Sequence, residues 1–523
     1  MWNIPESQTA GDLGDLVDQI KDYQFTHGAM IKLARTNEGP TVLSRPIGVS
    51  VYPTPFPRAR FQEAIDLQQA FNKLYAGIAE DPEWLEETLR HLIDTDSFTR
   101  SLWDIHKDAS RYQAETISLE HQPITLGIFR SDYMLHQPNE ASSSSYSSSS
   151  TVSSSFRTAQ LKQVDFNTFS ATGGCHATTA AQMHAHLSLY NSNNNNAHTL
   201  PATNRTAPAL IAALAAAHAA YGPSKSGHPL AILVLVRSAP TADICDERPL
   251  EYGLWSRSPP IECHRLPFGT PVLHRTTLGP GGALLYRIPG RSGSTREVSV
   301  AYFRAGAEAG EYGDDGVAAR FFVERSCAVK VPSVLAQLAT WRAVQRRLAG
   351  EGGAVERFLG ARADGLARAV RRCFAPMYTL DAKSEEGLRA RGLVAEKEGA
   401  GGYVVKRGAG GAGAPGSVWG ADIPGFLGGV EERLWRDYVL MERIRPPAVE
   451  GTLMGPRGLY RGSVVSELGV FGVVMWERRK GGGGVEILKN ENAGWSFKTK
   501  AAHVNEMSVI KGYGCFDCPA LVD

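Results

Sequence analysis

Apolar residues recur at helical spacing between residues 59 and 95, where they fall along one face of the chain. The pattern restarts after Asp81-Pro82, and it therefore predicts two packed helices that meet at this break. The face comprises Phe61, Ile65, Leu67, Phe71, Leu74, Ile78, Trp84, Leu85, Leu89 and Leu92. Similar patterns predict helices over 207–221 and 317–347, and an arginine-rich helix with a solvated face over 362–372.

Short apolar runs rich in β-branched and aromatic residues alternate with these helices and predict strands. The runs cover 124–129, 161–166, 231–236, 298–303, 403–405, 438–441 and 464–474. Gly481–Gly484 separates the strand-like stretches 470–476 and 485–488, which favours a hairpin with a flexible connection. Strands mixed with helices over this length predict an α/β or α+β enzyme.

Two low-complexity segments interrupt this pattern. Residues 142–155 are almost all serine, and residues 191–196 read Asn-Ser-Asn-Asn-Asn-Asn. Because neither segment can bury enough apolar surface to offset its ordering entropy, we expect both to be mobile surface insertions.

Composition narrows the functional class. The chain has 523 residues, 43% of them hydrophobic, and its formal net charge is +1, so no global field favours nucleic acid or an anionic membrane. The N-terminus has no signal-peptide pattern, and no apolar run is long enough to span a bilayer. The seven cysteines lack zinc-site spacing and indicate reduced thiols. We therefore expect a cytoplasmic protein.

The glycine-rich stretch Gly408–Gly413 follows a predicted strand and admits three interpretations. It matches G-x-G-x-x-G, the dinucleotide fingerprint, but Pro415 and Gly416 discourage the helix that this fingerprint requires. A low-complexity Gly/Ala linker is therefore favoured over this fingerprint. The third interpretation is a flap whose backbone N–H groups close over nucleotide phosphates, with Lys406 supplying positive charge. A Walker A sequence is absent.

Asp165 and Asn167 stand at the end of the predicted strand 161–166, where strand alternation directs both side chains to one face. A carboxylate beside an amide oxygen suits Mg²⁺, although the same pair is common in turns. Further charged residues follow or precede other predicted strands. Such ends often line clefts in α/β enzymes. These residues are Arg130, Arg304, Glu442, Glu467 and Lys500.

In this order, the segments resemble eukaryotic glutathione synthetase, and the C-terminal segment 505–517 is similar to the fungal form. The most specific pieces are Arg-Ser-Asp-Tyr-Met at 130–134, Leu-Lys-Gln-Val-Asp-Phe-Asn-Thr-Phe-Ser-Ala at 161–171, and Tyr-Phe-Arg at 302–304. Glu-Arg-Ser at 324–326, Tyr-Val-Leu-Met-Glu at 438–442 and Ser-Glu-Leu-Gly-Val-Phe-Gly at 466–472 add to them.

The resemblance implies an α/β ATP-grasp fold with permuted topology, an inserted α/β substrate-binding domain and a glycine-rich lid. On this basis residues 1–205 form the N-terminal part of the ATP-grasp core, with the serine-rich insert at 142–155. Residues 206–340 form the inserted domain, and 341–523 the C-terminal part of the core, with the lid at about 375–450.

The resemblance also implies a cytoplasmic homodimer that uses ATP and Mg²⁺ to join γ-glutamylcysteine to glycine through an acyl phosphate. Such chemistry depends on positioning and charge neutralisation more than on a protein nucleophile.

Carried over by position, the resemblance assigns four sets of residues. The metal ligands are Asp165 and Asn167, and the catalytic residues are Arg130, Lys406 and Lys498. The nucleotide and cofactor residues are Asp165, Lys406, Met441, Glu442, Arg443, Ile444, Glu467, Lys500 and Glu506. The substrate residues are Arg130, Ser170, Ala171, Thr172, Arg304, Lys498, Val509 and Ile510.

The chain departs from the family pattern at several positions. Its glycine-rich stretch lacks the glutamate that serves as a Mg²⁺ ligand in the family, and Asp165 replaces a glutamate. Arg342 and Lys498 stand where lysine and arginine are expected, and neither exchange is conservative at a bidentate site. Glu247 replaces a substrate-binding glutamine, and Ala305 and Ala307 replace larger residues. A ligase with another amino-acid or thiol-peptide substrate, and an inactive paralogue, therefore remain open as alternatives.

Overall fold

A computed structural model describes most of the chain. The described residues are 10–33, 43–115, 122–138, 156–169, 171–190, 199–238, 242–290, 294–313, 315–360, 363–410, 416–479 and 484–523. The serine-rich and asparagine-rich segments and the second half of the glycine-rich stretch, on which several predictions depend, lie outside these ranges.

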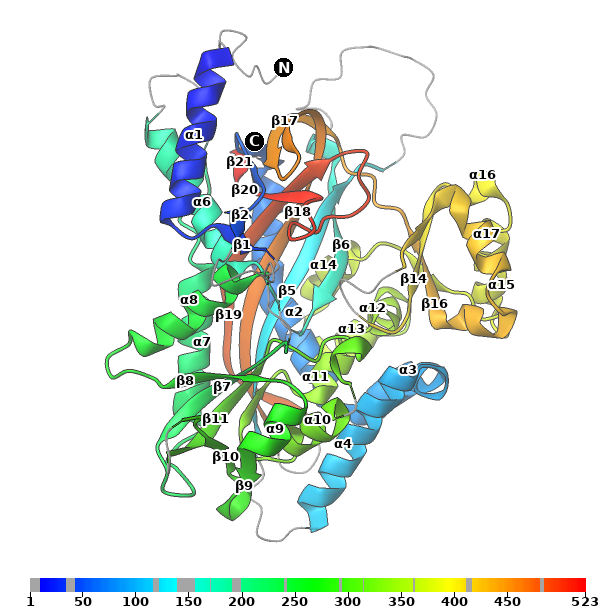
Figure 1. Cartoon of the computed structure of the whole chain (residues 1–523). Helices are drawn as coiled ribbons and strands as arrows, with labels where there is room; N and C mark the ends of the chain where they lie inside the picture. Colours follow the sequence, from blue (N-terminus) through cyan, green and yellow to red (C-terminus); the bar gives the residue numbers. More distant parts are fainter. Residues whose placement is uncertain are drawn as a thin grey trace.

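A seven-stranded sheet runs through the centre of the molecule (Figure 1). Its order is β17 (Val449–Gly455), β3 (Val49–Ser50), β20 (Gly514–Asp517), β19 (Val485–Ala501), β18 (Gly458–Arg478), β5 (Ile124–His136) and β6 (Gln160–Asn167). All neighbours are antiparallel except β20 and β3, and β17 also pairs with β18. The predicted β18–β19 hairpin is confirmed, with Arg478 opposite Val485.

Helix α2 (Arg58–Ala79) packs directly on this sheet, and α3 (Pro82–Thr95) and α4 (Ser97–Glu115) follow it. The predicted break at Asp81-Pro82 is confirmed, because the Asp81 carboxylate accepts a hydrogen bond from the N–H of Trp84 at 3.0 Å and starts α3. Close approach of α2 requires Gly472 on β18, since a Cβ there would lie 2.1 Å from Oδ1 of Asn72.

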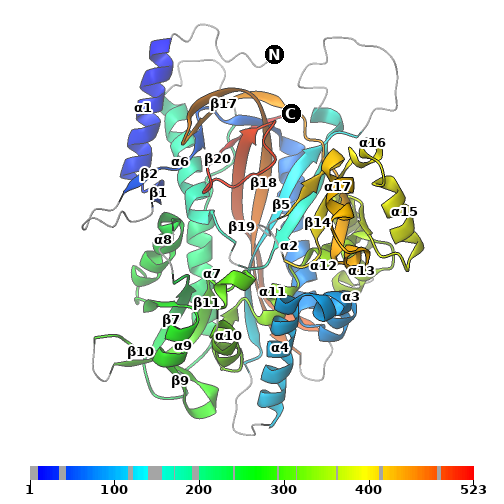
Figure 2. The same ribbon diagram turned by 45° about the vertical axis from the view of Figure 1, so that its right-hand side comes forward.

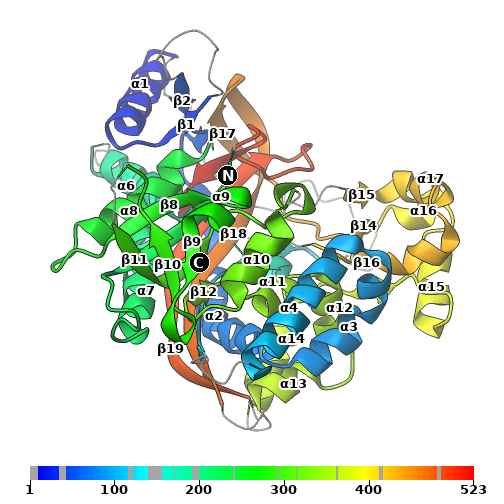
Figure 3. The same cartoon turned by 60° about the horizontal axis from the view of Figure 1, so that its bottom comes forward.

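A second sheet lies beside the lower part of the central sheet (Figures 1 and 3). Its order is β8 (Cys263–Pro267), β7 (Leu230–Val236), β11 (Thr295–Phe303), β10 (Leu284–Arg287) and β9 (Thr276–Leu278), and β12 (Val329–Val331) also pairs with β11. Helix α7 (Thr206–Ala220) packs against strands of both sheets and joins them in one apolar cluster. Helix α8 (Ile244–Trp255) lies against α7.

A third, smaller sheet stands to one side with three helices, as Figure 2 shows. Its antiparallel strands follow the order β13 (Met377–Thr379), β16 (Tyr438–Glu442), β14 (Tyr403–Arg407) and β15 (Val418–Trp419). Its helices are α15 (Glu385–Leu393), α16 (Lys397–Ala400) and α17 (Ile423–Gly428), which share an apolar cluster with the strands.

The remaining elements flank these sheets. They are α1 (Ala10–Thr26), β1 (Met30–Lys32), β2 (Ser44–Pro46), β4 (Thr54–Pro57), α6 (Gly174–Tyr190), α9 (Thr270–Arg275), α10 (Gly316–Glu324), α11 (Val334–Leu338), α12 (Arg342–Ala349), α13 (Ala354–Leu359), α14 (Asp364–Cys373) and β21 (Pro519–Val522), with short 3-10 turns at Pro280–Gly282, Ala309–Glu311, Gly420–Asp422 and Glu432–Asp437. In the described part of the chain, no helix is long and apolar enough to cross a membrane.

The α/β class is confirmed, but three local predictions were wrong. The helix predicted over 317–347 is interrupted, because the β-branched residues before Pro332 form strand β12 and a proline cannot continue a helix. Strand β5 does not end at Phe129 but runs on to His136, so that Arg130 lies within the strand. Glu467 likewise lies within β18, whereas Lys500, next to the last residue of β19, lies at a strand end as predicted.

Candidate active site

Four neighbouring strands of the central sheet bring charged side chains together. Asp132 on β5 lies opposite Asp165 on β6, and Arg130 lies opposite Asn167. On the other side of β5, Gly469 of β18 is opposite Asp132. Glu467, two residues before Gly469, pairs in register with Lys498 on β19, and their side chains form an ion pair of 2.5 Å. We use the name central charge cluster for the charged residues at this place, which are Arg130, Asp132, Asp165, Glu467, Lys498, Arg342 and Lys406.

Arg130 and Asp132 form the tightest pair of this cluster. Nε and Nη2 of Arg130 donate to the two carboxylate oxygens of Asp132 at 2.6 and 2.7 Å, and Nη1 donates to the carbonyl of Thr172 at 2.6 Å. Both side chains are buried. Although burial alone would raise the pKa of Asp132, the charges of Arg130 and Lys498 hold it below its usual value. The guanidinium fork of Arg130 is therefore occupied by a residue of the chain itself.

Gly469 provides the space for this pair. A Cβ at this position would lie 2.6 Å from Oδ1 of Asp132, 2.7 Å from Oγ of Ser496 and 3.0 Å from Cδ of Arg130. Only glycine therefore leaves room for the paired side chains beneath β18.

Asp165 and Asn167 share one face of β6, as the strand alternation predicted. Nδ2 of Asn167 donates to Oδ1 of Asp165 at 3.1 Å and to Oδ2 of Asp132 at 3.0 Å. The ladder between β5 and β6 skips Val164, so that Asp165 is presented after a local bulge. Burial and the neighbouring charge of Asp132 raise the pKa of Asp165 to about 6.

Arg342 at the start of α12 supports this bulge. Its Nη1 donates to the carbonyl of Val164 at 3.1 Å and to Oε1 of Gln345 at 3.2 Å, while Nη2 lies 3.9 Å from Oδ2 of Asp165. Nε2 of Gln345 in turn donates to Oε1 of Gln163 at 3.0 Å. Sequence pattern alone does not predict this support, because Arg342 and Val164 are 178 residues apart in the chain.

Lys406 reaches the cluster from strand β14 of the small sheet. Burial and the charge of Arg342 lower the pKa of its ammonium to about 7, although Asp165 and Glu467 act in the opposite direction. A lysine placed among carboxylates and a second cation in this way is well suited to receive an additional anion, such as a phosphate.

The donor set at Asp165 fits a divalent cation that is shared with phosphates. In the described ranges, no group of three or more His, Cys, Asp or Glu side chains is arranged to hold a metal ion. The carboxylate of Asp165 is nevertheless destabilised by the like charge of Asp132, a situation that a cation would relieve. The amide of Asn167 points its nitrogen at the two aspartates, which leaves its oxygen to accept.

The predicted nucleotide residues 441–444 lie at the C-terminal end of β16, an interior strand of the small sheet, so that the edge in question is formed by the ends of its strands. Met441 is buried in an apolar cluster with Val404 and Met377, and Ile444 packs against it. Glu442 accepts a hydrogen bond from the hydroxyl of Tyr378 at 2.9 Å. The edge therefore combines an apolar surface with a fixed carboxylate.

Two predicted nucleotide cations lie near this edge. The guanidinium of Arg443 lies 5.7 Å from the ring centre of Trp419, and the ammonium of Lys500 donates to the carbonyl of Val504. Burial lowers the pKa of Lys500, against the opposing effect of Glu467. Lys500 therefore connects this edge electrostatically to the central charge cluster.

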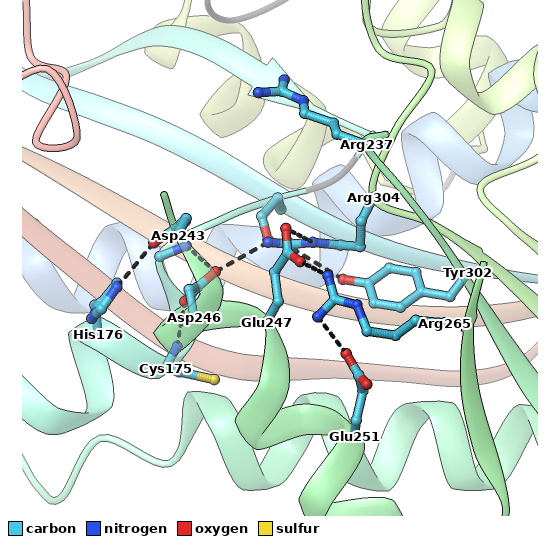
Figure 4. A network of polar contacts seen from close by, with 12 residues as sticks. Cys175, His176, Arg237, Asp243, Asp246, Glu247, Glu251, Arg265, Tyr302 and Arg304 are labelled. Carbon is cyan, nitrogen blue, oxygen red and sulfur yellow. Dashed lines mark hydrogen bonds and ion pairs between the residues drawn. The ribbon is translucent and has the colours of Figure 1, made fainter. Parts of the chain in front are cut away.

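Arg304 follows β11 and belongs to a second network (Figure 4). Its side chain is 3% exposed, yet its contacts are long: 3.3 Å from Nη2 to Oδ2 of Asp246, 3.8 Å from Nε to Oε1 of Glu247, 3.3 Å to the hydroxyl of Tyr302 and 3.5 Å to the carbonyl of Ala171. Among the described residues, Nε of Arg304 has no hydrogen-bond partner. Arg304 is thus a buried cation with weakly satisfied donors.

The other predicted substrate residues are more dispersed. Ala171 is buried and Thr172 is exposed just before α6, and Ser170 lies outside the described residues. Val509 is buried in an apolar cluster with Met454 and Phe516, and Ile510 is partly exposed. Glu506 is paired with Lys511 at 2.9 Å in the same loop. Ala305 is buried, and Ala307 is half-buried.

The described ends of the glycine-rich stretch decide against one of its interpretations. The stretch connects the antiparallel strands β14 and β15, and the N–H of Gly408 donates to the carbonyl of Asp437 at 2.7 Å. Because a strand rather than a helix follows it, the dinucleotide fingerprint is wrong. The linker and flap interpretations remain, and residues 411–415 lie outside the described part.

Comparison with known proteins gives the class of this site. A family model described as "Eukaryotic glutathione synthase, ATP binding domain" matches residues 10–521. The glutathione synthetase large chain of Schizosaccharomyces pombe is 29% identical, covering 97% of each chain, and the glutathione synthetase of Bos taurus is 30% identical, covering 98% of each. A solved glutathione synthetase-like effector from Globodera pallida superposes with a TM-score of 0.71 at 20% identity over the whole of both chains, and shows a similar fold.

The fold and the match therefore define an ATP-binding enzyme class. The chain belongs to the eukaryotic glutathione synthase family, which confirms the resemblance found in the sequence. Identity to the fission-yeast and bovine relatives is nearly equal.

Proposed function

We propose that this protein is a ligase that joins γ-glutamylcysteine to glycine at the cost of ATP, giving glutathione. In the first step, a carboxylate oxygen of the dipeptide attacks the γ-phosphorus of ATP; the bond to the β-phosphate breaks, and ADP leaves. The glycine nitrogen then attacks the acyl carbon, phosphate leaves, and the nitrogen loses a proton. The observation that carries the proposal is the convergence of Lys406, Arg342 and Lys498 on Asp165, Asp132 and Glu467.

These cations match the requirements of phosphoryl transfer. Lys406 and Arg342 would face the phosphates, and Lys500 would lie towards the apolar edge formed by Met441 and Ile444, where the adenine would bind. Burial and the charge of Arg342 lower the pKa of Lys406, so the negative charge of an ATP polyphosphate would favour its charged form.

Mg²⁺ would be held by Asp165 and Asn167 and shared with the phosphates. When bound, it would neutralise phosphate charge during transfer. The neighbouring residues have roles that do not require the metal ion. Arg342 and the bulge at Val164 orient Asp165, and Arg130 holds Asp132 in its ionised state.

For the dipeptide, the geometry favours Arg304 over Arg130. Arg130 already binds Asp132 with two hydrogen bonds of 2.6 and 2.7 Å, whereas the contacts of the Arg304 guanidinium are 3.3 Å or longer within the described part of the chain. A substrate carboxylate would therefore gain more by binding Arg304. Arg130 is better placed to fix Asp132 and the carbonyl of Thr172.

The domain organisation belongs to the same proposal. Residues 1–205 and 341–523 would form the ATP-grasp core with permuted topology, 206–340 the substrate-binding domain, and the sheet at about 375–450 the lid. We also propose a cytoplasmic homodimer. The apolar cluster that the third sheet shares with its helices supports its treatment as a unit, whereas the second sheet shares an apolar cluster with the central sheet.

The test is phosphate release with ATP, Mg²⁺, γ-glutamylcysteine and glycine, each omitted in turn, with the product identified by mass. Glutathione formed only in the complete mixture supports the proposal. ATP turnover that is indifferent to both amino substrates indicates a ligase for another substrate. A folded protein that binds no nucleotide indicates an inactive paralogue.

A further inference from the structure

The two carboxylates nearest Arg304 are both engaged elsewhere. Asp246 accepts hydrogen bonds from the N–H groups of Gly173 and Cys175 at 2.8 and 2.9 Å, and thereby caps the N-terminus of α6. These contacts are shorter than its 3.3 Å contact with Arg304. The position of Asp246 is therefore set by α6 rather than by Arg304.

Glu247 is drawn away from Arg304 by a second arginine. Arg265 on β8 forms an ion pair from Nη2 to Oε2 of Glu247, while Nη1 donates to Oε1 of Glu251 at 2.8 Å (Figure 4). The other oxygen of Glu247 remains 3.8 Å from Nε of Arg304 without a hydrogen bond. Because the side chains of Arg265 and Glu247 are only 12% and 10% exposed, water screens this competition weakly.

We infer that Arg265 is a positioning residue that keeps Arg304 available to a substrate carboxylate by holding Glu247 away from it. This inference rests on the proposed function, which places the dipeptide at Arg304. Oε1 of Glu247 lies 3.8 Å from Nε of Arg304. Without Arg265, a movement of about 1 Å would bring this oxygen to hydrogen-bond distance from Nε. A paired Arg304 would then bind the dipeptide less well, because the substrate would have to displace Glu247.

The charge count of the network supports this role. Asp246, Glu247 and Glu251 face Arg304 and Arg265, with Arg248 adding a contact of 2.7 Å to Glu251 at a more exposed position. Loss of Arg265 would leave Asp246, Glu247 and Asp243 as the carboxylates whose charges act on Arg304. Of these, Glu247 is the one within reach of its free Nε.

The experiment is a double-mutant cycle that follows KM for γ-glutamylcysteine and kcat separately. We expect Arg265→Gln to raise KM about tenfold with little change in kcat, since the lost interaction concerns binding. The double variant Arg265→Gln/Glu247→Gln should regain a KM near that of the wild type, because the amide brings no charge to compete for Arg304. Glu247→Gln alone should lower KM, because it removes the charge within reach of the free Nε of Arg304.

The matched control is Arg296→Gln, which breaks the ion pair of Arg296 with Glu262 in the same sheet and has no contact with Arg304. It should leave KM unchanged. If Arg265→Gln does not alter KM, or if the double variant is no better than the single one, the inference is wrong. If Arg265→Gln does not fold, Glu247→Gln serves as the test. A tenfold rise of KM in Glu247→Gln would then show that the inference about Arg265 is wrong.

Wild-type enzyme in the same assay separates the two proposals. If it forms no glutathione, and titration calorimetry detects no binding of γ-glutamylcysteine, the proposed function fails and the inference fails with it. If wild type forms glutathione while the cycle shows no rescue, only the role of Arg265 is rejected.

Discussion

Asp132 and Asp165 lie directly opposite each other on β5 and β6, and the side-chain amide of Asn167 donates to both carboxylates at 3.0 and 3.1 Å. The two acids are not equivalent. Arg130 occupies Asp132 on both oxygens, whereas the nearest cation to Asp165, Arg342, lies 3.9 Å away. This asymmetry keeps Asp132 ionised and leaves Asp165 with a raised pKa, available for a cation.

Gly469→Ala tests the space beneath β18. The new Cβ would lie 2.6 Å from Oδ1 of Asp132, so we expect the Arg130–Asp132 pair to shift and stability to fall by about 1–3 kcal/mol, with a larger loss of kcat. Chemical denaturation and steady-state kinetics measure both effects. Gly365→Ala in α14 is the control, since a Cβ there meets nothing within 4 Å. Equal effects of the two substitutions would refute the steric argument.

Arg130→Ala should impair both folding and the substrate site. It leaves the buried carboxylate of Asp132 unpaired, at an expected cost of about 3–5 kcal/mol of unfolding free energy. We also expect a raised KM for γ-glutamylcysteine, because the carbonyl of Thr172 loses its donor. Denaturation of Arg130→Ala/Asp132→Asn checks the cause: stability should partly return, and an additive loss would contradict the pairing.

From the lowered pKa of Lys406 we expect the protein to take up protons when ATP binds. The pKa of the Lys406 ammonium is lowered to about 7 in the free protein, so part of the population is neutral above this pH. Phosphates favour the charged form, and binding at pH 7–8 should therefore take up protons. Calorimetry in two buffers of different ionisation enthalpy measures this uptake. Lys406→Arg stays charged throughout and should show little of it; uptake that persists in this variant would assign the proton to another group.

From the raised pKa of Asp517 we expect this residue to make a pH-dependent contribution to the free energy of unfolding. The hydroxyls of Thr54 and Thr499 donate to its buried carboxylate at 2.5 and 2.6 Å, and Ser50 donates as well. Burial raises its pKa to about 6 against these hydrogen bonds. Its contribution is therefore fully present at pH values below the pKa of the unfolded chain, and it is lost as pH rises through about 6.

Denaturation at pH 4–8 checks this behaviour. Asp517→Ala should cost about 3–5 kcal/mol, because several buried hydroxyls lose their acceptor. Asp517→Asn should remove the pH-dependent contribution, and Asp523→Ala, at an exposed ion pair with Arg58, serves as the control. A pH profile that is the same in Asp517→Asn and wild type would assign the dependence to other groups.

Sequence reasoning found the pieces that depend on local pattern. The alternation in β6 placed Asp165 and Asn167 on one face, and Asp81-Pro82 marked the start of α3. It missed Asp132, although the segment containing it was recognised, because a polar residue inside a buried strand is explained only by the partner that lies across from it. The roles of Arg342 and Arg265 depend on elements distant in sequence, and no periodicity reports such contacts.

The most direct test of the central claim is glutathione formation by wild type and Asp165→Ala, measured by mass in parallel under saturating ATP, Mg²⁺, γ-glutamylcysteine and glycine. We expect product from wild type only in the complete mixture and none from Asp165→Ala, with both proteins showing the same fold by circular dichroism. Undiminished turnover in Asp165→Ala would contradict the assignment of this carboxylate and of the central charge cluster as the site of ligation.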